Sequence, residues 1–376
     1  MYSLAFVAVV SFASALLLTP LMRNLALRWG WVDKPDQYRH LHSQIVPRLG
    51  GVPILCSYLI AFSLLLVLPF SARSVVHTGF PIAWRILPAA VLIFAAGVLD
   101  DLRGLRPWQK FAFQIAAGCI VFYSGVRITD AAGFTMPDWL SITVTLLWLS
   151  GCSNAFNLID GVDGLAAGSA LFATITILLG ALVNDNMALA LAVVPLAGAL
   201  LGFLRYNFNP ASIFLGDSGS LTIGFLLGCY AVIWSQKSAT VLGMTAPLFA
   251  LGVPLLDTAI AVVRRFLCSQ PIWEADRGHI HHRLLDRGLT PRKVVLVLYA
   301  ACAGAALLSL LASVAENHFK GVVIVLFCAA AWIGVQHLGY VEFGVAGRMF
   351  VDGALRRHLA EHIALRAFEH SLDAAS

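Results

Sequence analysis

The sequence predicts an all-α fold, a polytopic membrane helix bundle of about eleven transmembrane helices. Hydrophobic residues make up 59% of the 376 residues and charged residues only 12%, which is about half the charged fraction of a soluble domain. The mean hydropathy is +0.83, and the apolar residues form eleven separate runs. The sequence has no succession of short alternating strands, so a membrane β-barrel is disfavoured. Helices are the remaining way to satisfy backbone groups in lipid.

Each apolar run is close to the roughly 20 residues that a helix needs to cross the hydrocarbon core. The first run lacks a basic start and a small-residue cleavage site, so we interpret it as a spanning helix rather than a signal peptide. The ninth contains Pro247 and Pro254, which can break it. The predicted spans are 1–22, 51–70, 81–99, 110–126, 138–153, 162–183, 187–204, 218–234, 239–263, 294–314 and 320–337.

The basic residues predict the orientation of the bundle. If the N-terminus is periplasmic and the C-terminus cytoplasmic, 20 of the 25 Lys and Arg residues lie on the cytoplasmic side, as the positive-inside rule requires. Residues 1–346 are predicted to form a single integral membrane domain, because no repeat or low-complexity linker divides them. Residues 347–376 are predicted to form a cytoplasmic tail, either an amphipathic surface helix or a frayed end. The seven cysteines include no CxxC pair, which argues against a disulfide framework or a zinc site.

Acidic and amide residues follow two of the predicted spans on the cytoplasmic side. Asp100 and Asp101 come directly after the third span, where they could bind a cation, act as a base, or simply pair with a nearby arginine. Asn157, Asp160 and Asp163 step by three, so they would share one face if the segment were helical. Their oxygen atoms suit Mg²⁺. The alternative is a polar turn that joins two helices.

A third polar segment leads into the eighth span. Asp217 is followed by Ser-Gly-Ser, a sequence that can begin a helix whose free N–H groups attract phosphate. Asp217 itself would repel phosphate unless a metal ion bridged them, which also favours Mg²⁺. Asn207 and Phe214 precede it, and Phe214 could stack on a base or merely pack at the membrane interface. Arg48, before the second span, is either a ligand contact or a topology anchor.

Segment 277–287 contains three histidines and three arginines. A zinc site is disfavoured because no cysteine accompanies the histidines and the arginines would repel a cation. Binding of a pyrophosphate or a sugar fits better, and a positively charged topology anchor is the alternative. The candidate residues are His279, His281, His282 and Arg283.

Taken together, these motifs resemble those of the polyprenyl-phosphate N-acetylhexosamine-1-phosphate transferase family. The resemblance covers about 47–287 and is carried by Pro47-Arg48-Leu49-Gly50-Gly51, Asp100-Asp101, the segment 154–164, the segment 214–220 and His279-Ile280-His281-His282. The His-Ile-His-His form and the eleven spans are similar to the WecA-like branch. Cell-wall precursor translocases typically have three consecutive histidines and ten spans. Many members carry a third acidic residue where this chain has Gly104.

The resemblance implies transfer of an N-acetylhexosamine-1-phosphate, foremost GlcNAc-1-phosphate, from a UDP-sugar to undecaprenyl phosphate, with release of UMP. It implies Mg²⁺ or Mn²⁺ as cofactor, an inner-membrane location, a site facing the cytoplasm, and a lipid-linked glycan such as O-antigen downstream. A homodimer is a further expectation, and nucleic acid is not an expected partner. The implied metal ligands are Asp217 and Asn157, the catalytic carboxylates Asp100, Asp101, Asp160 and Asp163, and the substrate-binding residues Arg48, Asn207, Phe214, His279, His281, His282 and Arg283.

Two alternatives stay open at this point. Within the family, the chain could be a phospho-MurNAc-pentapeptide translocase of peptidoglycan synthesis. From a different class, it could be a secondary transporter, which would place its charges near mid-membrane and show pseudo-symmetric halves. The clustering of acidic residues at one boundary disfavours the transporter.

Overall fold

The structure, a computed structural model, describes residues 2–33, 46–67, 73–131, 134–236, 244–267, 278–314 and 317–338. The predicted tail 347–376 lies outside the described residues. The helices are α1 (Tyr2–Trp29), α2 (Gly51–Val67), α3 (Arg73–Arg103), α4 (Pro107–Tyr123), α5 (Asp138–Ile159), α6 (Leu165–Val183), α7 (Met187–Asn207), α8 (Gly216–Gln236), α9 (Thr245–Ala250), α10 (Gly252–Leu267), α11 (Ile280–Asp286), α12 (Pro291–Val314) and α13 (Asn317–His337). Two antiparallel pairs of two-residue strands complete the list: β1 (Val32–Asp33) with β2 (Val46–Pro47), and β3 (Asp130–Ala131) with β4 (Phe134–Thr135).

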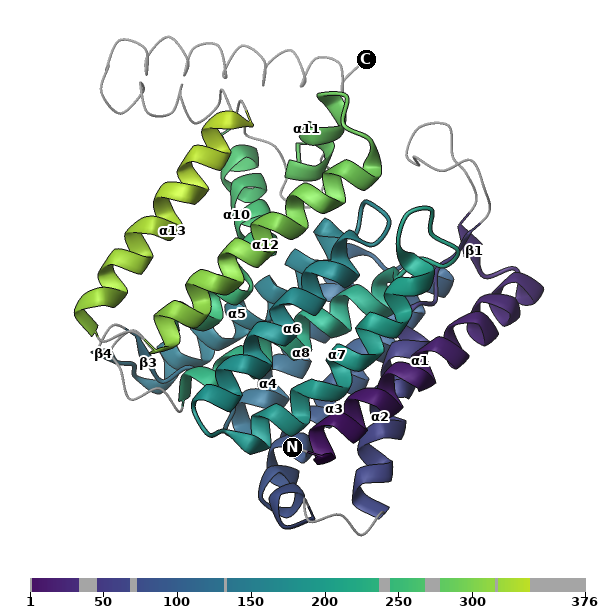
Figure 1. The fold of residues 1–376 in the computed structure, drawn as a ribbon, viewed down its shortest axis with the longest axis horizontal. Coiled ribbons are helices and arrows are strands. Elements are labelled where there is room, and N and C mark those ends of the chain that lie inside the picture. Colours follow the sequence, from purple (N-terminus) through teal and green to yellow (C-terminus); the bar gives the residue numbers. More distant parts are fainter. Residues whose placement is uncertain are drawn as a thin grey trace.

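The predicted helical membrane bundle is confirmed in its class. Every predicted span overlaps a helix, and the ninth overlaps two. Within the described residues, seven helices are long and apolar enough to cross a membrane: α1, α5, α6, α7, α8, α12 and α13. The total of about eleven crossings and the orientation of the termini stay predictions. Strand β1 and helix α11 lie at one edge of the bundle, and β3 and β4 lie at the opposite edge (Figure 1).

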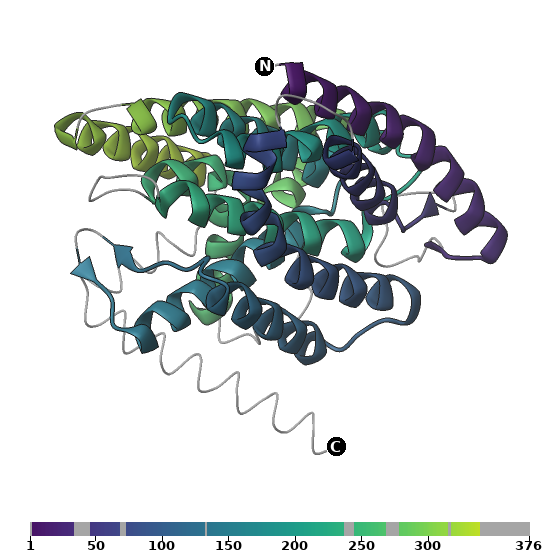
Figure 2. The same ribbon diagram turned by 90° about the horizontal axis from the view of Figure 1, so that it is seen from below.

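The centre of the bundle is α8, in which every residue from 218 to 234 is buried. Helices α3, α5 and α6 pack directly against it, whereas α1 and α13 lie on opposite flanks of the molecule (Figures 1 and 2). Ser153 in α5 donates its hydroxyl hydrogen bond to the carbonyl of Leu221, at 2.9 Å. Close contacts of this kind are typical of membrane helices, which associate through small residues and interhelical hydrogen bonds.

Gly97 allows α3 to approach the first turn of α8. A Cβ atom at this position would lie 2.5 Å from the carbonyl oxygen of Asp217 and 2.5 Å from the Cα atom of Ser218, both backbone atoms that cannot give way. Since any side chain would force the two helices apart, glycine is required here. The contact carries the Asp100-Asp101 pair to the start of the central helix.

The predicted break in the ninth span is present, between α9 and α10 at Leu251. Pro254 lies in the first turn of α10 and has no N–H group to donate to the carbonyl of Ala250, four residues earlier. A helix continuing from α9 would therefore lose a hydrogen bond and meet the proline ring. The interruption sets α10 as a separate short helix, which positions the histidine segment described below.

Candidate active site

The segment that contains Arg48 lies directly beside the segment that leads into α8. Phe214 donates its backbone N–H to the carbonyl of Pro47 at 2.8 Å, and Gly50 donates to the carbonyl of Phe214 at 3.0 Å. Gly51 donates to Leu215 in the same way, at 3.0 Å. Two predicted motifs more than 160 residues apart in the sequence thus form one short extended pairing. It places Arg48 and Phe214, both half-buried, next to Asp217.

The two adjacent aspartates have different partners. Asp101 accepts the backbone N–H groups of Asp217 and Ser218 on its two oxygens, at 2.8 and 3.0 Å. It therefore caps the first turn of α8 from a different helix, and complements the positive end of the helix dipole. Asp100 accepts the backbone N–H of Leu105 at 2.6 Å and pairs with Lys110 at 2.6 Å. Asp101 therefore fixes the start of α8 to α3, while Asp100 faces Lys110.

Lys110 joins two of the predicted site carboxylates. Its ammonium nitrogen lies 2.6 Å from an oxygen of Asp100 and 2.6 Å from an oxygen of Asp217. Asn157 adds a hydrogen bond to Asp217 and donates to the hydroxyl of Ser220 at 3.0 Å. Helices α3, α4, α5 and α8 thus converge on Asp217, and the lysine supplies the positive charge that lets both carboxylates approach.

Three aspartates at the end of the bundle, outside the membrane-crossing segments, have raised pKa values, through burial first and through neighbouring carboxylates second. Burial raises the pKa of Asp100, and the neighbouring Asp217 raises it further. Burial also raises the pKa of Asp101 to about 7, although hydrogen bonds from Ser218 oppose the shift. For Asp160 burial is again the largest cause, and nearby carboxylates add to it, so its pKa stands well above the usual value. The cluster is thus short of positive charge, and a cation bound among these groups would be stabilised.

Of the two interpretations of Asn157, Asp160 and Asp163, the structure shows the turn that joins two helices and not one continuous helical face. Helix α5 ends at Ile159, Asp160 is its C-terminal cap, and Gly164 adopts φ +81° before α6 begins. The turn brings Asp163 beside the segment before α8 instead, where it accepts hydrogen bonds from the amide of Asn209 at 3.0 Å and the backbone N–H of Ala211 at 2.9 Å. Asp163 therefore holds that loop in place.

Asn207, at the end of α7, also braces this loop. Its amide donates to the carbonyl of Ile213 at 3.0 Å. Its carbonyl oxygen Oδ1 is buried and has no hydrogen-bond partner in the described part of the chain. A buried acceptor without a partner is costly, so Oδ1 is the atom with which Asn207 would meet a ligand.

The histidine segment reaches the acidic cluster through α11. His281 is 1% exposed, and its ring lies against Gly161, where a Cβ atom would stand 2.5 Å from Nε2. The rings of His279 and His281 are parallel within 7°, with centroids 5.7 Å apart, and those of His281 and His282 are 4.3 Å apart. Arg283 donates to the carbonyl of Leu338 at 3.5 Å. All three histidines therefore lie together beside the turn that carries Asp160.

His281 makes the stability of the protein depend on pH. Burial, and next the positive charge of His282, lower the pKa of His281 from 6.5 to about 3. Between these values the unfolded chain binds a proton that the folded chain does not, so stability rises with pH and is lost on acidification below pH 6.5. Acidification from pH 6.5 to 5.5 should cost about 1 kcal/mol through this residue alone. Thermal unfolding in detergent should show a fall in Tm for the native protein that is smaller in the His281→Gln variant, and equal falls in the two would contradict the assignment.

Two residues of this region have no signal of their own in the sequence. Lys110 reads as one more cytoplasmic positive charge, and only the packing of α4 against the bundle shows that it bridges Asp100 and Asp217. Asp257 reads as one more carboxylate near Arg264 and Arg265 in the sequence, and only the packing of α10 shows that it pairs with His279. Both are placed at the site by contacts between separate helices.

The donor chemistry of the cluster fits Mg²⁺. The described residues contain no ready-made group of three or more His, Cys, Asp or Glu that could hold a metal ion. Magnesium, however, is commonly held by one or two carboxylates together with substrate phosphates and water. The oxygens of Asp217 and Asn157, with Asp160 close by, supply that kind of partial shell.

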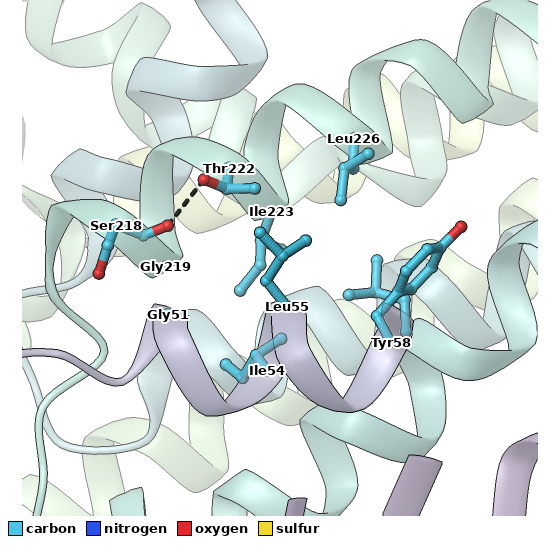
Figure 3. A pocket seen from close by; sticks show the side chains of 10 residues that line it. Gly51, Ile54, Leu55, Tyr58, Ser218, Gly219, Thr222, Ile223 and Leu226 are labelled. Atoms are coloured by element: carbon cyan, nitrogen blue, oxygen red, sulfur yellow. Dashed lines mark hydrogen bonds between the residues drawn. The ribbon is translucent and has the colours of Figure 1, made fainter. Parts of the chain in front are cut away.

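A small pocket opens beside the first turn of α8. It runs between α2 and α8 from Gly51, Ser218 and Gly219 towards Tyr58 and Leu226 (Figure 3). Its lining is mainly aliphatic, and its far end is closed by Tyr58, whose hydroxyl donates to the carbonyl of Ala192 at 2.9 Å. The pocket thus begins at Ser218, the residue after Asp217, and extends between the two helices.

Comparisons with known proteins agree with this geometry. The family described as glycosyl transferase family 4 matches residues 83–235. A Bacillus subtilis protein named as a probable undecaprenyl-phosphate N-acetylglucosaminyl 1-phosphate transferase is 36% identical, over 77% of this chain and 80% of that protein. A Mycolicibacterium smegmatis decaprenyl-phosphate N-acetylglucosaminephosphotransferase is also 36% identical, over 74% of each chain. A Streptococcus thermophilus phospho-N-acetylmuramoyl-pentapeptide-transferase is 32% identical, but over only 52% of this chain and 61% of its own length.

Proposed function

Because the chain belongs to the family of polyprenyl-phosphate N-acetylglucosamine-1-phosphate transferases, we propose that it transfers GlcNAc-1-phosphate from UDP-GlcNAc to undecaprenyl phosphate. The reaction releases UMP and starts a lipid-linked glycan of the cell envelope. The observation that carries the proposal is the Asp100–Lys110–Asp217 cluster at the start of the central helix, with an apolar pocket next to it. The ammonium group of Lys110 in this cluster can attract an anionic sugar donor and a lipid-borne phosphate to one point.

The chemistry is the displacement of one phosphate by another. An oxygen of the lipid phosphate forms a bond to the β-phosphorus of the nucleotide sugar, the bond between that phosphorus and the bridging oxygen breaks, and UMP leaves with the bridging oxygen and the electron pair of that bond. Catalysis of this step is mainly positioning and neutralisation of charge. Asp100, whose pKa burial raises, would accept the proton of the lipid phosphate, and Lys110 would offset the charge that gathers between the phosphates.

Mg²⁺ is part of the proposal. Asp217 and Asn157 would hold the ion, which when bound supplies charge neutralisation for the diphosphate. Asp101 would keep Asp217 in place through the backbone of α8, and Asp160 and Asp163 would shape the neighbouring turn. Substrate contacts are assigned to the residues that surround this centre: Arg48, Asn207, Phe214, His279, His281, His282 and Arg283.

The proposal also includes the location of the site. The positive-inside pattern supports a bacterial inner-membrane protein with this edge of the bundle facing the cytoplasm, where UDP-sugars are found. In support, α11 lies at the edge opposite to β3 and β4 (Figure 1). Labelling of single cysteines placed in the α11 segment and in the β3–β4 segment of intact cells tests this directly, and periplasmic labelling of α11 would exclude it.

The function is tested by UMP release from the purified protein in detergent. Undecaprenyl phosphate is supplied with UDP-GlcNAc, other UDP-N-acetylhexosamines or UDP-MurNAc-pentapeptide in separate reactions, with and without EDTA. We expect UMP release and a radiolabelled lipid product with UDP-GlcNAc, loss of both in EDTA, and recovery with Mg²⁺ or Mn²⁺. Preference for the pentapeptide donor would instead favour the translocase, and turnover that resists EDTA would exclude the metal.

A further inference from the structure

Helix α10 holds the histidine segment at two points on one of its faces. Asp257 accepts a hydrogen bond from the backbone N–H of Ile280 on Oδ1 at 2.8 Å, and its Oδ2 lies 3.0 Å from Nδ1 of His279. Arg264, two helical turns later, donates to the carbonyl of Gly278 at 2.6 Å. Gly278, His279 and Ile280, at the start of α11, are therefore fixed to α10, which begins directly after the break at Leu251.

The contact between Asp257 and His279 is buried. Asp257 is 2% exposed and His279 is 4% exposed. A carboxylate at such a site requires partners on both oxygens, because an unpaired buried charge is very costly. A carboxylate is only an acceptor, so Nδ1 of His279 must carry the hydrogen. Nε2 is then the ring nitrogen that remains for other groups.

We propose that Asp257 is a positioning residue that fixes the tautomer and the ring orientation of His279, so that Nε2 of His279 is presented to the sugar-phosphate part of the donor. This inference rests on the proposed function for the identity of the donor. The parallel ring of His281, which lies against Gly161, extends the arrangement to the turn that carries Asp160. A carboxylate in α10 thereby fixes the ring of His279, against which the ring of His281 lies parallel.

A purely structural role is the alternative, since Asp257 also binds the first N–H of α11. The Asp257→Asn variant separates the two roles. Its side-chain oxygen can still accept from Ile280, but its amide nitrogen must donate to Nδ1, which forces the hydrogen of the ring onto Nε2. The cap is retained while the tautomer is inverted, and an inversion of this kind in a carboxylate–histidine pair can cost several orders of magnitude in rate.

The experiment compares kcat and KM for UDP-GlcNAc in Asp257→Asn, His279→Gln and the double variant. Thr258→Val is the matched control, because Thr258 is the next residue in α10 and its hydroxyl is buried without a partner among the described residues. We expect kcat/KM to fall at least about tenfold in Asp257→Asn, with a Tm close to that of Thr258→Val. The kcat/KM of the double variant should be within twofold of that of the less active single variant. Activity of Asp257→Asn within twofold of the control, or single effects that multiply in the double variant, would overturn the proposal.

A spectroscopic measurement on the unaltered protein decides the matter even if a variant does not fold. ¹⁵N NMR of the histidine-labelled protein, with the His279 signal assigned by its loss in His279→Gln or, should that variant not fold, by specific labelling, should show hydrogen on Nδ1. A neutral His279 with its hydrogen on Nε2 would overturn the proposal. If the native protein releases no UMP from UDP-GlcNAc while the NMR result holds, the proposed donor is wrong and the positioning role of Asp257 stands.

Discussion

Replacement of Asp217 by Asn is expected to abolish sugar-phosphate transfer while the protein still inserts and folds. The change removes one negative charge and keeps the size of the side chain and an oxygen that Lys110 can contact at its present position. The cap on α8 is unaffected, because Asp101 binds the backbone N–H of residue 217 and not its side chain. We expect a fall of about a thousandfold in single-turnover UMP release, in line with the loss of a principal electrostatic group.

The matched control for this change is Asp130→Asn. Asp130 is an exposed carboxylate on β3, at the opposite edge of the bundle, and its hydrogen bonds are to Thr129 and Thr135. It should retain full activity. Detergent elution profiles and Tm values of both variants should match the native protein. Mg²⁺-dependent turnover at near-native rate in Asp217→Asn would remove this residue from the site.

Replacement of Lys110 by Gln is expected to have the second largest effect. The ammonium group lies 2.6 Å from both Asp100 and Asp217, and without it two carboxylates from different helices face each other across a partly buried space. Removal of one partner from a buried ion pair costs about 3–5 kcal/mol; these side chains are 13 to 24% exposed, so water reduces the loss to about 1–3 kcal/mol. We expect at least a hundredfold loss of activity and a lower Tm.

Lys110→Arg is the control, because it keeps the positive charge but changes its shape. It should retain the Tm of the native protein and more activity than Lys110→Gln. Millimolar Mg²⁺ should raise the Tm of Lys110→Gln more than that of the native protein, because a divalent cation can take over the neutralisation of the two carboxylates. Equal Tm values and equal rates for Lys110→Gln and the native protein would show that the lysine has no part in the site.

The sequence was sufficient for the helical membrane class, for the break near Pro254 and for the grouping of polar motifs around Asp217. These follow from hydropathy, from the missing N–H of proline and from the alternation of loops between two sides of a membrane. The roles of Lys110 and Asp257 could not be found in this way. Each depends on a contact between helices, 107 residues apart for Lys110 and Asp217 and 22 residues apart for Asp257 and His279.

The turn after α5 shows a different limit. A spacing of three residues is compatible with a helix, and Asn157, Asp160 and Asp163 satisfy it. Helix α5 ends at Ile159 nevertheless, because Asp160 already departs from helical geometry and Gly164 takes a left-handed conformation. Spacing alone does not say where a helix ends. Because α5 ends at Ile159, Asp163 does not share a helical face with Asn157 and instead binds the loop before α8.

Helix α8 is enclosed on all sides by its neighbours, and its first residues carry Asp217. Many enzymes keep their reacting groups on peripheral loops that can loosen on their own. Here, Asp217 lies in the first turn of the buried central helix, so this end of α8 cannot unfold without disturbing the packing of the whole bundle. On heating, the protein should therefore lose its activity and unfold at the same temperature.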